Sequence, residues 1–402
     1  MTDRRHRTRS ATAACGVLLG LALAAAGCAS TGSPGAAPTR AAAAVVDFPE
    51  LTAGVEAGIA QGRYPGAVYA VSRGEEVLTL QAAGVADIGD GKQMTTDAVF
   101  RLMSMTKPVT AVAVMILVEE GRLDLDAPVG RYLPAFEGFG AEGALVTLRH
   151  LLTHTSGIGF GSLPSGQTTL EARATTASAR TLRVRPGSQW AYSGVEGPDV
   201  LARVVEVVAG EPFDRFVQNR IFSPLGMTDT GWTLSEAQRA RLVGLYDARD
   251  GVIAEANPFL ADATYPSGGF GLFSTAPDMM RFVRMLANEG ELDGRRILST
   301  QSVRTLHTSQ LPAGLPGLGA GLGSGLLMRI VLDPAAAGSP LPAGAYGWSG
   351  AYGTHFWVDP ETGLAAVWMI NLNNAGGAGS PDALAFEELV VKACLAQPRC
   401  RN

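Results

Sequence analysis

The sequence predicts an α/β fold in which an antiparallel β-sheet is flanked by N- and C-terminal helices and carries an inserted all-helical subdomain. Strand-like runs occur near both ends of the folded part, helical patterns dominate the middle, and a helical pattern stands at each end. With 402 residues, 47% of them hydrophobic and 17% charged, the chain is long and apolar enough to bury a large core.

Apolar spacing and turn residues place the individual elements. The expected helices are at 51–59, 104–121, 147–153, 199–209, 213–221 and 381–394. The expected strands are at 67–72, 76–81, toward residue 100, and at 326–332, 353–358 and 364–371. The helical subdomain is expected over about 120–265, so the helix that starts near residue 104 stands at the seam between sheet and insert, where ligands usually bind.

At the start of that helix, Ser104 precedes Lys107 by three residues. This spacing places the hydroxyl and the amine on one helix face, about one turn apart. Pro108 places Ser104 at or just before the first turn, where unpaired N–H groups and the helix dipole favour an oxygen nucleophile. Lys107 is one of three lysines among 32 basic residues, and a buried lysine, unlike arginine, can lose its proton. The alternative for this segment alone is an ordinary N-cap serine followed by a solvated lysine.

Residues 1–27 have the pattern of a secretory signal peptide: four arginines, an apolar run over 11–26, and small residues before Cys28. Cysteine directly after Ala-Gly resembles the lipobox of bacterial lipoproteins and predicts lipidation of Cys28, with ordinary signal cleavage as the alternative. Residues 28–45 are typical of a flexible linker, and the folded domain is expected over 46–402. We therefore expect an exported protein of the bacterial cell envelope, lipid-anchored on the extracytoplasmic face or otherwise secreted.

The charge balance argues against a nucleic-acid partner. Removing residues 1–27 takes four arginines and Asp3 from the 32 basic and 37 acidic residues, which leaves a net charge of about −8. We also expect no cofactor, and contact with a membrane only through the lipid at Cys28. The sequence does not predict an oligomeric state.

Cysteine and histidine usage predicts a disulfide and no metal. In an oxidising compartment Cys394 and Cys400 are expected to form a small-loop disulfide; as a metal pair they would lack further ligands. His150 and His154 lie four residues apart, but no third ligand is in reach by sequence. The chain also contains no Gly-x-Ser-x-Gly elbow, which argues against an α/β-hydrolase triad.

Two further motifs follow Ser104-Met-Thr-Lys107 along the chain: Tyr192-Ser193 and Trp348-Ser-Gly350. In this order and at these separations they resemble the three motifs of the serine β-lactamase-like family, which includes class C β-lactamases, DD-peptidases and family VIII carboxylesterases. Supporting matches lie at 123–129, 151–157, 221–228, 268–275 and 353–360. The resemblance covers nearly all of residues 47–395 and implies this family's fold and a serine hydrolase activity.

The resemblance also implies a role for each motif residue. Ser104 would be the nucleophile that forms an acyl-enzyme, and Lys107 and Tyr192 would share the role of general base. The backbone N–H groups of Ser104 and Ala351 would form the oxyanion hole. The residues expected to bind the substrate are Trp348, Gly350 and Gly194.

Two departures from the penicillin-recognising pattern bear on the substrate. Gly194 stands where a Tyr-x-Asn motif has the amide that holds an amide substrate, and Trp348 replaces the Lys or His that meets a substrate carboxylate. Losing a charge-assisted contact costs about 1.5–3 kcal/mol, so we expect short-chain carboxylic esters as substrates, as in the esterase branch. The alternatives are a weak β-lactamase or DD-peptidase that acts on cell-wall peptides, and a non-catalytic envelope binding protein.

Overall fold

The computed structural model describes residues 46–164, 166, 168–182, 184–256, 262–312, 314–315, 317–373, 375–376 and 380–401. The expected signal peptide, Cys28 and the linker lie outside these residues. Within the described part, no helix combines the length and the apolar character needed to cross a membrane.

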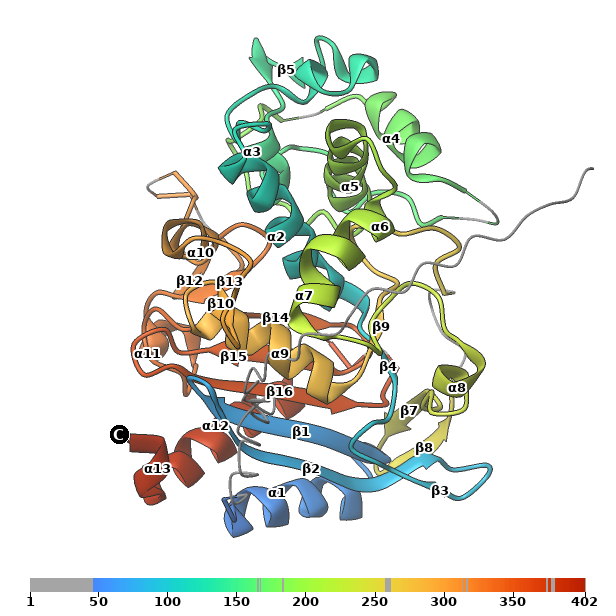
Figure 1. Ribbon diagram of the computed structural model, residues 1–402, viewed down its shortest axis with the longest axis vertical. Helices are drawn as coiled ribbons and strands as arrows, with labels where there is room; N and C mark the ends of the chain where they lie inside the picture. Colours follow the sequence, from blue (N-terminus) through green and yellow to red (C-terminus); the bar gives the residue numbers. More distant parts are fainter. Residues whose placement is uncertain are drawn as a thin grey trace, which may run out of the picture. The chain divides into compact units, whose positions relative to one another are not determined.

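An eight-stranded antiparallel sheet forms the centre of the fold, in the order β12-β13-β14-β15-β16-β1-β2-β3 (Figure 1). Its strands are β1 (Gly66–Arg73), β2 (Glu76–Asp87), β3 (Lys92–Gln93), β12 (Leu322–Ser324), β13 (Arg329–Val331), β14 (Tyr346–Gly350), β15 (Thr354–Val358) and β16 (Leu364–Ile370). The two ends of the folded chain meet where β1 pairs with β16. All residues of β16 are buried, so both faces of the sheet must be covered.

Helices from distant parts of the chain provide this cover. α1 (Pro49–Ala60) and α12 (Pro381–Ala396) lie on one face of the sheet, and α9 (Ala276–Ala287) lies on the other (Figure 1). Under α12, Trp368 of β16 stacks on Phe386, with ring centroids 4.7 Å apart. α12 continues to α13 (Pro398–Arg401), and a disulfide joins Cys394 to Cys400.

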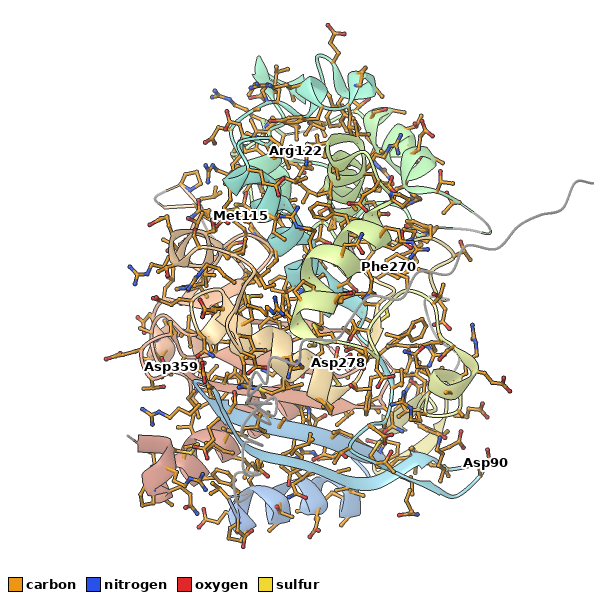
Figure 2. The ribbon with its side chains drawn as sticks, in the orientation of Figure 1. Asp90, Met115, Arg122, Phe270, Asp278 and Asp359 are labelled. Carbon is orange, nitrogen blue, oxygen red and sulfur yellow. A yellow bond between two sulfur atoms is a disulfide. The ribbon has the colours of Figure 1, made fainter. Side chains whose placement is uncertain are left out.

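α2 (Thr106–Glu119) precedes the helical insert in the chain and is buried from Thr106 to Leu117 (Met115 on this helix and Arg122 beyond its end are labelled in Figure 2). The remaining elements before α9 are β4 (Phe100–Arg101), η1 (Met103–Met105), η2 (Val129–Arg131), η3 (Pro134–Phe136), β5 (Gly140–Ala141), β6 (Ala144–Leu145), α3 (Leu148–Leu152), α4 (Leu170–Ser178), α5 (Glu196–Ala209), α6 (Phe213–Val217), η4 (Gln218–Phe222), α7 (Ser223–Leu225), α8 (Glu236–Arg239), β7 (Tyr246–Arg249), β8 (Val252–Glu255) and β9 (Phe273–Ser274). Those after α9 are β10 (Glu291–Leu292), β11 (Arg295–Arg296), α10 (Thr300–Leu306) and α11 (Pro334–Ala337).

The predicted fold class is confirmed, with differences in detail. The insert expected to be all-helical also contains the hairpins β5–β6 and β7–β8. The strand expected over 326–332 is shortened to β13, because Leu327 has a left-handed backbone with φ +54° and donates its N–H to Leu152 of α3. β14 was not expected as a strand, since its glycines lower the apparent strand propensity.

Candidate active site

Ser104 lies in the tight turn η1, directly before α2. The preceding residue, Met103, has φ +49°, a conformation that costs energy for a residue with a side chain. Two hydrogen bonds hold the turn in place: Leu102 donates its N–H to the carbonyl of Leu272 (2.8 Å), and Thr354 Oγ1 donates to the carbonyl of Leu102 (2.9 Å). The half-buried Ser104 is therefore presented from a backbone fixed on both sides.

Three of the predicted side chains meet at the Ser104 hydroxyl. Lys107 Nζ lies 3.1 Å from Ser104 Oγ, and the Tyr192 hydroxyl lies 2.8 Å from it. Lys107 is fully buried, and its Nζ is 5.1 Å from the centroid of the Tyr192 ring. A hydroxyl within hydrogen-bond reach of both an amine and a phenol is the arrangement needed for an activated nucleophile.

The buried carboxylate of Asp199 holds the loop whose Gly269 carbonyl accepts a hydrogen bond from Lys107. Lys107 Nζ donates to the carbonyl of Gly269 (2.8 Å). Asp199 of α5 accepts hydrogen bonds from Ser267 Oγ (2.5 Å) and from the N–H of Gly268 (3.1 Å), directly before that carbonyl. Burial raises the pKa of Asp199 above its ordinary value, although these hydrogen bonds oppose the shift. Asp199 and the 267–269 loop were not predicted as site residues (the next residue, Phe270, is labelled in Figure 2).

His154 and Trp348 pack around Tyr192. The His154 and Trp348 ring centroids lie 4.9 Å and 6.0 Å from that of Tyr192. The N–H of Ser193 donates to His154 Nδ1 (3.2 Å). Complete burial, reinforced by the nearby charge of Lys107, lowers the pKa of His154 to about 3. His154 is therefore neutral at physiological pH and supports the position of Tyr192.

The backbone of the third motif, Trp348-Ser-Gly350, lies against η1, the turn that carries Ser104. A Cβ on Gly350 would lie 2.1 Å from the carbonyl oxygen of Leu102, so only glycine lets β14 approach η1 this closely. Ala351 follows in the turn between β14 and β15. Trp348, expected to bind the substrate, is only 4% exposed and packs against the rings of His154 and Tyr192.

The position of Gly194 is covered by Phe160, a residue that the sequence did not single out. A Cβ on Gly194 would lie 2.4 Å from Cε2 of the Phe160 ring. The carbonyl of Phe160 accepts the N–H groups of Gly194 and Val195, each at 3.1 Å. The loop before α4 is thus attached to the second motif.

On the other face of β14, a buried polar chain connects the sheet to α12. Ser349 Oγ lies 2.7 Å from His355 Nδ1, and His355 Nε2 lies 3.0 Å from Glu387 Oε1, which also accepts from Arg329 (2.7 Å). Burial acts to raise the pKa of Glu387, but the His355 hydrogen bond and the charge of Arg329 hold it below its ordinary value. These contacts fasten β14, and with it the third motif, to the C-terminal helix.

The two histidines of the apparent metal pair have other partners. His150 Nδ1 accepts the N–H of Thr147 (3.2 Å) in the capping box of α3, and His154 accepts that of Ser193. Within the described ranges, no three His, Cys, Asp or Glu side chains gather as metal ligands.

Known proteins are similar to this chain in sequence and in fold. A family model described as Beta-lactamase matches residues 51–388. Esterase EstB of Burkholderia gladioli is 35% identical over 379 residues, covering 85% of this chain and 94% of the relative. Penicillin-binding protein 4 of Amycolatopsis lactamdurans is 36% identical over 243 residues, covering 59% of this chain and 64% of the relative. The solved structure of EstCE1, described as a hydrolase with promiscuous acyltransferase activity, has a TM-score of 0.77 at 26% identity and covers 85% of this chain and 97% of its own.

The resemblance predicted from the three motifs is confirmed by these matches. The family model spans most of the folded domain, and the similarity to an esterase extends over nearly the whole of that relative. The chain therefore belongs to the serine beta-lactamase family, on the side of its esterases, and is a serine hydrolase.

Proposed function

We propose that this hydrolase cleaves short-chain carboxylic esters through an acyl-Ser104 intermediate, with Lys107 and Tyr192 as its general base pair. The observation that carries the proposal is the pair of hydrogen bonds, from Lys107 Nζ and the Tyr192 hydroxyl, that meet at Ser104 Oγ. Both groups lie within hydrogen-bond distance of the oxygen whose proton must leave, so either one can accept that proton once it is itself deprotonated.

The reaction follows from this arrangement. Ser104 Oγ attacks the ester carbonyl while the base pair takes its proton, and the negative charge on the carbonyl oxygen is stabilised by the N–H groups of Ser104 and Ala351. The tetrahedral intermediate collapses, and the proton passes to the departing alkoxide. Water, deprotonated by the same pair, then attacks the acyl-enzyme and releases the acid.

Two features of the site support an ester rather than a β-lactam or a peptide. Trp348 carries no charge for a substrate carboxylate, and Gly194 offers no side-chain amide. Relatives named Esterase EstB and Lovastatin esterase, the latter 29% identical over 367 residues, agree with this choice.

A rate comparison tests the proposal. Purified protein is assayed on p-nitrophenyl butyrate and on a chromogenic cephalosporin, with Ser104→Ala as the blank. We expect ester turnover well above the cephalosporin rate and its loss in the variant. A faster cephalosporin rate would favour the β-lactamase or DD-peptidase alternative, whereas inactivity on both would favour the envelope binding protein.

We propose in addition that the protein is exported and lipidated at Cys28, which follows Ala-Gly at the end of the apolar run. Labelled palmitate fed to expressing bacteria should enter the wild-type protein but not Cys28→Ala. Equal labelling of both proteins would contradict the anchor.

A further inference from the structure

We propose that Phe160 is a specificity-determining residue: its ring forms an apolar wall of the substrate site and selects esters with an apolar acyl chain. The inference rests on the proposed ester hydrolysis and adds to it the residue that sets the acyl preference.

The first observation is that the ring fills the space next to Gly194. A Cβ built on Gly194 would lie 2.4 Å from Cε2 and 2.7 Å from both Cδ2 and Cζ of Phe160, distances that Cβ atoms essentially never show. An Asn side chain at position 194 therefore cannot coexist with the ring in this place. Where a Tyr-x-Asn motif would offer an amide, this site offers an aromatic ring.

The second observation is the distance to the reacting groups. The Phe160 ring meets the Tyr192 ring edge-on, with centroids 6.1 Å apart and an interplanar angle of 63°. The Tyr192 hydroxyl is hydrogen-bonded to Ser104 Oγ. Tyr192 thus contacts both the nucleophile, through its hydroxyl, and the Phe160 ring, through its own ring.

The third observation is that the loop beneath the ring is firmly held. Glu196, which is completely buried, accepts hydrogen bonds from Ser162 N (2.9 Å), Ser162 Oγ (2.6 Å) and Arg180 Nη2 (2.7 Å). Gly161, with φ +88°, lies so close to Glu196 that a Cβ there would be 2.8 Å from its Cγ. Together with the two N–H groups that the Phe160 carbonyl accepts, these contacts fix the backbone that carries the ring.

The ring itself remains 51% exposed on this fixed backbone. The ring lies beside Tyr192 with half of its surface in water. When an apolar acyl chain covers it, apolar surface of both groups leaves water, and this stabilises the bound substrate. Burial of one methylene contributes about 0.8 kcal/mol, so each methylene that the ring shields should raise kcat/KM about fourfold.

The test compares wild type, Phe160→Ala and the control Leu332→Ala on p-nitrophenyl acetate, butyrate and hexanoate. Leu332 is matched to Phe160 because it is also an apolar residue that is 51% exposed. For Phe160→Ala we expect a loss in kcat/KM of less than threefold on acetate, of about 15-fold on butyrate, which has two more methylenes, and of at least that much on hexanoate. The control should keep the wild-type profile.

A chain-length profile that stays parallel to wild type in Phe160→Ala would overturn the inference while leaving ester hydrolysis intact. If Phe160→Ala instead changes only how kcat/KM depends on the length of the alcohol, measured on ethyl and hexyl acetate, then Phe160 does not contact the acyl chain. Absence of ester turnover in the wild type would instead refute the proposed function, and the acyl preference with it.

A second measurement tests the geometry without turnover. Gly194→Asn should lower the melting temperature when Phe160 is present and lower it much less in the Phe160→Ala background, because the clash is then removed. Equal losses in the two backgrounds would show that the ring does not occupy this position.

Discussion

Replacing His154 tests how strongly burial beside Tyr192 and Lys107 disfavours the charged form of this histidine. His154 is completely buried, and its pKa is lowered from 6.5 to about 3. Between these pH values the unfolded chain binds a proton that the folded protein does not. The free energy of unfolding contributed by this residue is therefore fully present above pH 6.5 and is lost as the pH falls toward 3. At 1.36 kcal/mol per pKa unit, the full loss is roughly 5 kcal/mol.

The assay is urea unfolding of wild type and His154→Asn at pH 7.5, 6, 5 and 4. Asn tolerates the left-handed backbone of this position, where φ is +59°, and its side chain can accept the N–H of Ser193. Other titratable groups are the same in both proteins and cancel in the difference. Between pH 4 and 6 the stability of the variant should fall less steeply, by up to about 1.4 kcal/mol per pH unit.

Equal slopes for the two proteins would refute this reasoning, because His154 would then take up its proton in the folded state as readily as in the unfolded one. The acid limb of kcat/KM should also be the same in both, since a neutral His154 does not act as the base.

Three further substitutions test residues that contact Ser104 or hold the segments around it. Tyr192→Phe removes the hydroxyl 2.8 Å from Ser104 Oγ and should lower kcat on p-nitrophenyl butyrate about 10²–10⁴-fold at an unchanged melting temperature; a near-normal kcat would exclude Tyr192 from proton transfer. Asp199→Asn weakens the hold on the loop that carries Gly269, so steady-state kinetics should show a lower kcat at a similar KM; a change in KM alone would contradict this positioning role. Glu387→Ala leaves Arg329 buried without its carboxylate and should lower the free energy of unfolding in urea by about 3–5 kcal/mol; a loss below about 1 kcal/mol would mean that the network is dispensable.

Much of the fold was predictable because its elements carry strong local patterns. α2 contains the unbroken apolar run 111–118, and β16 is apolar throughout, so burial of both could be inferred before their partners were known. β14 was missed because Gly347 and Gly350 are poor strand formers. Both are required by tertiary contacts, since a Cβ on Gly347 would lie 2.0 Å from the carbonyl oxygen of Phe356.

The candidate site was predictable where its residues form motifs with fixed spacing. Ser104, Lys107 and Tyr192 were found in this way, and the structure brings them together. Asp199 and Phe160 act through contacts with segments far along the chain, and such contacts leave no local pattern. The glycines on both sides of Phe160 were the available signal for a constrained loop, since Gly159 and Gly161 have φ of +74° and +88°.

The most direct test of the central claim is mass spectrometry of the acyl-enzyme. Wild type and Ser104→Ala are mixed with p-nitrophenyl butyrate, quenched in acid within milliseconds and digested. We expect one butyryl group on the wild-type peptide that contains Ser104 and none on the corresponding peptide of the variant. A butyryl group on a different residue, or turnover by Ser104→Ala at the wild-type rate, would contradict Ser104 as the nucleophile.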